Sequence, residues 1–223
     1  MIITSITKYG DKGTRYRIDV DGEYWYILAD TLVMDFRLRK GMTVTEELLG
    51  EIRAAADYRK GRERAFYLLE SREHTKSELA TKLARNIDWE TARKIADEME
   101  SLGLIHETDY ARRLAQYLSS VKHHGGRRIY QELMKKGFSG SDIQAALDEI
   151  ETDEDELTAL VRKKYARYLQ PSDEEEEPSG FHRGYSKGKN KAIQGLMRLG
   201  YSFGESLAAV ERVEAELADE QQD

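Results

Sequence analysis

Residues Leu133–Ser139 read LMKKGFS, and sixty-three residues later Leu196–Ser202 read LMRLGYS. A degraded third copy, LARNID, lies upstream at Leu83–Asp88 and is one residue shorter. We call this short motif the repeated phrase. Each copy of it ends a helix-like run and is followed by another such run. Self-similarity at a spacing of roughly 50 residues is typical of repeats that each form one supersecondary unit. Repeat arrays usually present an extended surface to a partner, so the sequence favours a binding protein over an enzyme with a closed pocket.

The apolar spacing around these copies predicts three helices in each repeat. The first, or leading, helix of each repeat is expected at 62–71, 107–121 and 154–169. The second helix carries the repeated phrase (the phrase helix), and the third, or trailing, helix follows it. Gly137 and Gly200 stand where the phrase helix has to end, because glycine adopts the left-handed conformation there without steric cost. Capping signals mark the helix starts. They are Thr75-x-x-Glu78, Ser202-x-x-Glu205, Asp88 and Ser139.

The first 30 residues favour β-structure instead. Tyr16, Ile18 and Val20 alternate with polar residues, and Asp21-Gly22 suits a tight two-residue turn. Residues 23–28 predict the return strand, and the isoleucines at positions 2, 3 and 6 predict a third strand. A capping signal at 43–46 then marks the start of a helix.

We therefore expect a mainly α fold, with three tandem three-helix repeats in an elongated array and a small N-terminal β-hairpin or β-sheet head. The expected domains are 1–58 for the head and its linking helix, 59–106 for repeat 1, 107–152 for repeat 2 and 153–223 for repeat 3. Pro171 and Pro178 bracket five consecutive acidic residues at 173–177. These charges repel one another, so 170–186 is expected to be an acidic loop within repeat 3.

Composition excludes several classes of protein. The 223 residues contain no Cys, which excludes a disulfide framework and thiolate chemistry. No apolar run approaches the roughly 20 residues that cross a bilayer, so we expect a cytoplasmic protein without membrane contact. We also expect a monomer. The net charge of −7 argues against a simple nucleic-acid binder. However, the segment from Arg112 to Lys136 holds seven basic residues against one acid.

Several motifs carry a family resemblance. Residues 71–83 (SREHTKSELATKL) resemble the first repeat of RecX, the bacterial regulator of the RecA recombinase. Residues 102–112 (LGLIHETDYAR) look like the family's junction between its first two repeats, and 126–137 (GRRIYQELMKKG) is similar to its second-repeat core. The N-terminal hairpin with 38–42 (LRKGM) looks like the head of some members. Two features depart from the family pattern: the first copy has Asn86-Ile87 in place of the phrase glycine, and 173–177 is an acidic insertion.

The resemblance implies a regulatory protein that is not an enzyme and needs no cofactor. It implies binding in the groove of a RecA filament and modulation, mainly inhibition, of the recombinase and ATPase activities. Homologous recombination, DNA repair and the SOS response would be affected through RecA. The phosphates of single- or double-stranded DNA are a further candidate contact.

Basic residues near the repeat turns are the candidate contacts with RecA or DNA. At Gly125-Gly126 the turn brings together backbone N–H groups, a helix N-terminus and arginines, which suits a phosphate or a carboxylate. An ordinary solvated basic surface is the alternative interpretation at every turn. The candidate residues are Arg72, Lys76, Arg112, Lys122, Arg127, Arg128, Lys135, Lys136, Lys187, Lys189 and Lys191.

Other interpretations find less support in the sequence. His123-His124 has no third residue at metal-ligand spacing, so no metal site is expected. Tyr24, Trp25 and Tyr26 suit base stacking, as in single-strand-binding proteins, although packing within the sheet is the commoner role of such residues. The main alternative function is a helix-turn-helix transcription regulator. That function requires a base-reading helix and a dimerisation helix, and neither is evident.

Overall fold

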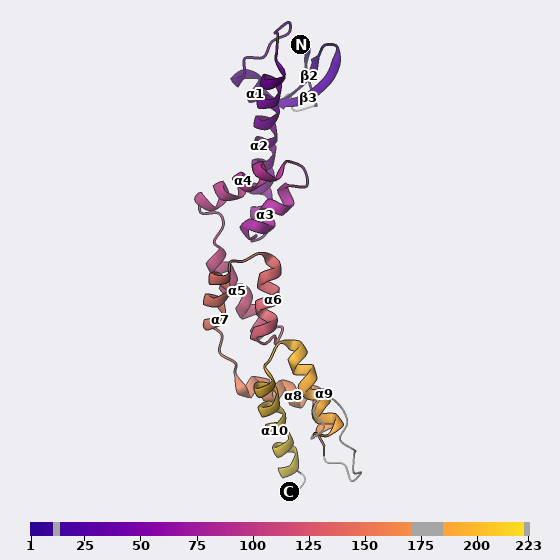
Figure 1. Cartoon of the computed structure of the whole chain (residues 1–223), viewed down its shortest axis with the longest axis vertical. Coiled ribbons are helices and arrows are strands. Elements are labelled where there is room, and N and C mark those ends of the chain that lie inside the picture. Colours follow the sequence, from indigo (N-terminus) through magenta and orange to yellow (C-terminus); the bar gives the residue numbers. More distant parts are fainter. Residues whose placement is uncertain (11–13, 171–184, 221–223) are drawn as a thin grey trace. The chain divides into compact units, whose positions relative to one another are not determined.

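The computed structural model describes residues 1–10, 14–170 and 185–220. The chain divides into two compact units, Met1–Ile105 and His106–Asp223. The predicted mainly helical fold with a small β head is confirmed (Figure 1). The predicted acidic loop at 170–186 falls almost entirely outside the described residues. The predicted domain boundaries stay a prediction.

The head of the first unit is a three-stranded antiparallel sheet in the order β1-β2-β3. Its strands are β1 (Ile3–Lys8), β2 (Arg15–Val20) and β3 (Glu23–Ala29). Asp21 and Gly22 form the turn between β2 and β3, with φ values of 51° and 89°. Asn, Asp and Gly tolerate such positive values best, which is why this pair predicts the hairpin. A short helix that the sequence did not predict, α1 (Asp30–Asp35), follows β3.

One long helix, α2 (Glu46–Ser71), joins the head to repeat 1. Leu49 and Ile52 of its N-terminal half are buried in the core of the head, and Ala65 and Leu68 of its C-terminal half are buried in the core of repeat 1. The helix therefore runs straight through the predicted boundary between residues 58 and 59. The sequence predicted two helices here, one beginning after residue 45 and a leading helix at 62–71.

The rest of the first unit consists of α3 (Lys76–Leu83) and α4 (Trp89–Ser101), which pack on α2. The predicted capping box at the start of α3 is present: the Glu78 N–H donates to the Thr75 hydroxyl, and the Thr75 N–H donates to the Glu78 carboxylate. The Asp88 side chain caps α4 as predicted. These bonds satisfy N–H groups that the first turn of a helix leaves without a partner.

The second unit contains two three-helix groups. The first consists of α5 (Glu107–Ser120), α6 (Gly126–Lys136) and α7 (Gly140–Asp148). The second consists of α8 (Glu154–Leu169), α9 (Lys187–Leu199) and α10 (Phe203–Asp219). Gly137 and Gly200 end α6 and α9 in the left-handed conformation that the sequence predicted.

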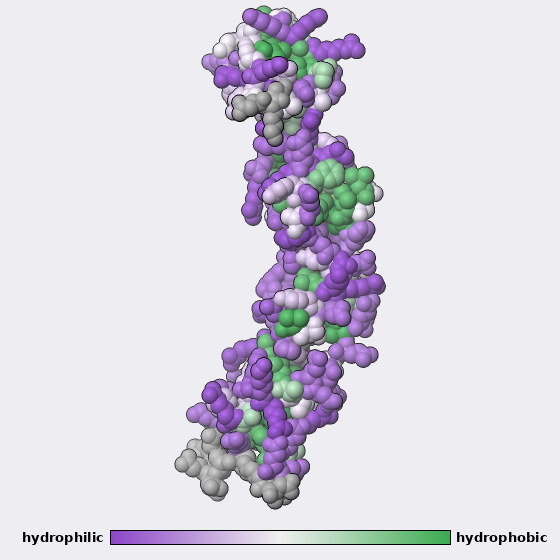
Figure 2. Space-filling view, turned by 180° about the vertical axis from the view of Figure 1, so that it is seen from behind, coloured by the Kyte–Doolittle hydropathy of each residue, from purple (hydrophilic) through white to green (hydrophobic). Residues whose placement is uncertain are grey.

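Each group in the second unit has its own hydrophobic core. The repeated phrase supplies two core residues to each: Leu133 and Phe138 in the first, Leu196 and Tyr201 in the second. The phrase recurs because both cores need the same anchor before and after the helix stop. Hydrophilic side chains cover much of the molecular face in Figure 2, with smaller hydrophobic patches between them.

Candidate functional site

The turn before α6 is held by the turn that ends α9. Gly125 is buried, and its N–H donates to the Leu199 carbonyl oxygen at 2.9 Å. The Arg127 N–H donates to the Gly200 carbonyl oxygen at 3.2 Å. Repeats 2 and 3 are thus joined backbone to backbone. The prediction that these N–H groups approach a phosphate is wrong for Gly125 and Arg127, because both already have carbonyl partners.

The side chains that follow this turn remain accessible. Arg127 is exposed, whereas Arg128 pairs with Glu132 at 3.1 Å. Tyr130 and Met134, one and two helical turns farther along α6, are 44% and 48% exposed. Arg127, Tyr130 and Met134 follow an i, i+3, i+7 spacing and share one face of the helix. We call Arg127, Tyr130, Met134 and the exposed Lys135 the α6 face.

Two other candidates in repeat 2 lie where α5 begins and α6 ends. Arg112 pairs with Glu149 at 2.9 Å, and the Lys136 ammonium lies 5.6 Å from the centre of the Tyr110 ring. Lys122, at the opposite end of α5, lies 5.7 Å from the Tyr117 ring centre. Arg112 is therefore partly neutralised. The two lysines each lie beside an aromatic ring, where cations are weakly stabilised.

The basic turn of repeat 3 is mainly used within the repeat. Lys189 is only 13% exposed and pairs with Glu211 at 3.1 Å and Glu214 at 3.0 Å. Burial lowers the pKa of Lys189, but the hydrogen bonds that its ammonium donates to these two carboxylates outweigh burial and raise the pKa above its usual value. The Lys191 ammonium lies 3.7 Å from the centre of the Tyr168 ring. Of the three predicted contacts in this turn, Lys189 thus has a structural role.

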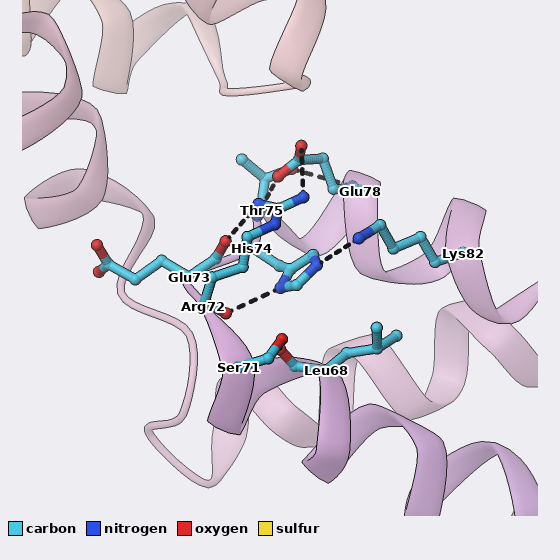
Figure 3. A network of polar contacts seen from close by, with 8 residues as sticks. All are labelled: Leu68, Ser71, Arg72, Glu73, His74, Thr75, Glu78 and Lys82. Carbon is cyan, nitrogen blue, oxygen red and sulfur yellow. Dashed lines mark hydrogen bonds and ion pairs between the residues drawn. The ribbon is translucent and has the colours of Figure 1, made fainter.

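The basic turn of repeat 1 surrounds a buried histidine (Figure 3). His74 is 3% exposed; its Nδ1 lies 2.9 Å from the Arg72 carbonyl oxygen and its Nε2 lies 2.8 Å from the Lys82 ammonium. Both contacts are satisfied by a neutral ring that donates from Nδ1 and accepts at Nε2. Arg72 also pairs with Glu78 at 3.6 Å. Lys76 pairs with Asp97 and Glu100, and the hydrogen bond that it donates to Glu100 is the main cause of its raised pKa.

The predicted residues of the second unit form three groups rather than one site. Helix α9 has 13 residues, and an α-helix rises about 1.5 Å per residue. Lys187 at its start therefore lies roughly 20 Å from Gly200, which contacts the turn before α6. Within α6, Arg127 and Lys135 are about 12 Å apart along the axis. The sequence did not predict Tyr130 and Met134 as contact residues. Each directly follows a residue of the buried apolar stripe of α6, Ile129 and Leu133, and this position outside the stripe was the one signal that they are exposed.

Comparison with known proteins gives the family. The family description "RecX, second three-helix domain" matches residues 107–147, which is the first helical group of the second unit. The regulatory protein RecX of Streptococcus sanguinis is 30% identical over 219 residues, which cover 97% of this chain and 80% of the relative. This chain belongs to the RecX family of regulatory proteins.

Further RecX comparisons agree with this assignment. The regulatory protein RecX of Clostridioides difficile is 28% identical over 168 residues, 74% of this chain and 79% of that protein. A crystal structure of regulatory protein RecX superposes with a TM-score of 0.61 at 26% identity, covering 96% of this chain and 98% of that one. As a RecX family member the chain is a regulatory protein and not an enzyme. None of the helices within the described residues is long and apolar enough to cross a membrane.

Proposed function

We propose that this protein binds RecA in the groove of its filament and lowers the recombinase and ATPase activities, thereby acting on DNA repair and the SOS response. Membership of the RecX family carries this proposal, because the similarity to a RecX protein extends over 97% of the chain. The residue types of the α6 face also support binding to a protein partner. A transcription regulator is not favoured by any feature of the described residues.

The α6 face is the proposed contact with RecA. It combines an arginine, a tyrosine and a methionine, which are residue types enriched in protein interfaces. Tyr130 and Met134 are exposed apolar side chains that gain from burial against a partner, at roughly 25 cal/mol per Å² of apolar area removed from water. Arg127 and Lys135 add charge that steers association with an acidic partner surface or with DNA phosphates.

The proposed mechanism is steric and electrostatic. RecA protomers have to move during ATP turnover and strand exchange, and tandem repeats that contact neighbouring protomers restrict that motion. The protein therefore needs no catalytic group. It acts by binding one filament conformation more tightly than the others, which is the general requirement for a partner that shifts a conformational equilibrium.

A RecA ATPase assay tests the proposal. We expect this protein to lower the single-strand-DNA-dependent ATPase rate of its cognate RecA at substoichiometric ratios. Replacing Arg127 and Arg128 by Ala should weaken inhibition at least about tenfold, since each hydrogen bond to a charged group contributes about 1.5–3 kcal/mol. The matched control replaces Lys163 and Lys164 of α8, both exposed, and removes the same charge. Equal losses would show that only bulk charge matters, and an unchanged ATPase rate with the wild-type protein would refute the proposal itself.

A further inference from the structure

We propose that the first unit carries a binding surface for single-stranded nucleic acid, which extends along one face of α2 from a cleft beside the head to a cluster of cations in repeat 1. This surface lies outside the α6 face. It would act without RecA, so the inference goes beyond the proposed function and does not depend on it.

The cleft lies where the β-sheet meets α2. Its volume of about 640 Å³ falls within the range of small-molecule sites. Three tyrosines line it, and of these Tyr9 and Tyr24 are 49% and 54% exposed. Three cations also line it, and among the described lining residues Glu63 is the one acid. The tyrosines are Tyr9, Tyr24 and Tyr26, and the cations are Arg15, Arg59 and Lys60.

One of these cations is held in place by its neighbours. Arg59 pairs with Glu63 at 3.2 Å and also donates to the Thr31 hydroxyl. Glu63 is thereby neutralised, which leaves the charge of the cleft positive. Exposed aromatic rings next to positive charge are the combination that single-strand-binding proteins use, because bases stack on the rings and phosphates pair with the cations.

The positive surface continues along α2. Lys60, Arg64 and Tyr67 follow an i, i+4, i+7 spacing, so they share one face of the helix, about 10 Å long. All three are exposed, and Tyr67 is 61% exposed. The Arg64 guanidinium lies 4.9 Å from the centre of the Tyr67 ring. The ring is thus held beside a cation with much of its surface open to solvent.

A cluster of cations lies beyond Tyr67. Burial is the largest cause that lowers the pKa of Lys82, and the charges of Arg72, Arg85 and Arg64 lower it further, while Glu78 raises it. Lys82 is therefore repelled by three arginines and attracted by one carboxylate, which itself pairs with Arg72. A phosphate group bound here would relieve this repulsion. His74, which accepts a hydrogen bond from Lys82, fixes the ammonium in place from the protein side.

Single-stranded nucleic acid fits this surface better than other polyanions. In a duplex the faces of the bases are stacked on one another and cannot reach Tyr67 or the tyrosines of the cleft. An acidic peptide matches the cations but has no regular series of flat rings. The first unit is also close to neutral, with eighteen Lys or Arg against nineteen Asp or Glu in residues 1–105, so most of the acidic excess belongs to the second unit.

Fluorescence anisotropy with the full chain, without RecA, tests the inference. The probe is a labelled oligothymidine of about 20 nucleotides, long enough for the site sizes of roughly 4–16 nucleotides that single-strand binders cover. Competitors are the unlabelled strand, a duplex of equal length, thymidine monophosphate and polyglutamate. We expect the strand to bind and to be displaced best by unlabelled strand. Tyr67→Ala should weaken binding at least about fivefold, the lower end of what loss of one stacking ring costs, and Tyr67→Phe should retain binding.

Two matched controls separate this surface from bulk effects. Tyr117 is a 45% exposed tyrosine of the second unit that also lies beside a lysine, so Tyr117→Ala should leave the affinity unchanged. Arg64→Gln should weaken binding, whereas Arg93→Gln, which neutralises an exposed arginine on α4, should not. Circular dichroism verifies that each variant is folded. Absence of binding at low salt, equal displacement by duplex, monophosphate or polyglutamate, or equal effects of Tyr67→Ala and Tyr117→Ala would each overturn the inference.

Discussion

Replacing Gly125 by Ala should loosen the contact between repeats 2 and 3. An added Cβ would lie 2.5 Å from the carbonyl carbon of Gly200 and 2.5 Å from the nitrogen of Tyr201. Both are backbone atoms, so neither can move away by a change of rotamer. The φ and ψ values of Gly125, −77° and 165°, are ordinary for alanine, so the effect is purely steric.

The expected magnitude follows from the atoms involved. Overpacking of a tight contact typically costs about 1–3 kcal/mol. The two backbone hydrogen bonds from Gly125 and Arg127 to the α9 turn contribute about 1 kcal/mol each and would lengthen or break. We therefore expect Gly125→Ala to lower the free energy of unfolding of the second unit by about 2–4 kcal/mol.

Urea denaturation measures this change, and hydrogen exchange localises it. The amide protons of Gly125 and Arg127 should exchange faster in the variant, because their carbonyl partners move away. Gly126→Ala is the matched control, since nothing lies within 4 Å of a Cβ at that position. Alanine is also the better helix former, so this control should be neutral or slightly stabilising. If both variants unfold at the same urea concentration, the two repeats are not joined through this glycine.

Two further perturbations address the histidine and the buried lysine. Burial lowers the pKa of His74 below its usual value, so the unfolded chain binds more protons than the folded chain under mildly acid conditions. The first unit should therefore lose stability as pH falls below about 6.5. Thermal unfolding between pH 7.5 and 5.5 should show this loss, and the loss should be smaller in His74→Gln. Lys189→Ala leaves the Glu211 and Glu214 carboxylates without their shared cation, so urea denaturation should show a loss of about 1–2 kcal/mol, whereas the same change at the exposed Lys163 should cost less than 0.5 kcal/mol.

The features that the sequence predicted correctly depend on local interactions. The capping box of Thr75 and Glu78 forms between residues three apart, and the left-handed turn at Gly200 depends on one residue. Both can be recognised without knowing the tertiary structure. The same holds for the hairpin at Asp21, where the turn fixes how two neighbouring strands pair.

The features that the sequence did not predict depend on partners far along the chain. Gly61 lies inside α2, where a Cβ would lie 2.6 Å from Ile95 and 2.7 Å from Ile87, so both side chains can pack there only because the residue is glycine. The carbonyl partner of Gly125 is 74 positions away, at Leu199. Likewise, a basic run such as 187–191 does not reveal that its central lysine faces two glutamates from α10. Charge pattern alone therefore overestimates how many basic residues remain available to a partner.

The repeats also differ in where they place the glycine that permits close packing. In repeat 1 the phrase turn has Ile87 instead of glycine, and the side chain of Ile87 packs against Gly61 of the preceding helix. In the second unit the phrase turn keeps Gly200, whose missing side chain lets Gly125 of the neighbouring repeat approach. In repeat 1 the bulky side chain at the phrase turn is thus accommodated by a glycine of α2. In repeat 3 the glycine at the phrase turn lets the backbone of repeat 2 approach. The departure of the first copy from the repeated phrase is therefore consistent with its contact with α2: repeat 1 packs on a continuous helix from the head, whereas repeat 3 bonds directly to the turn of repeat 2.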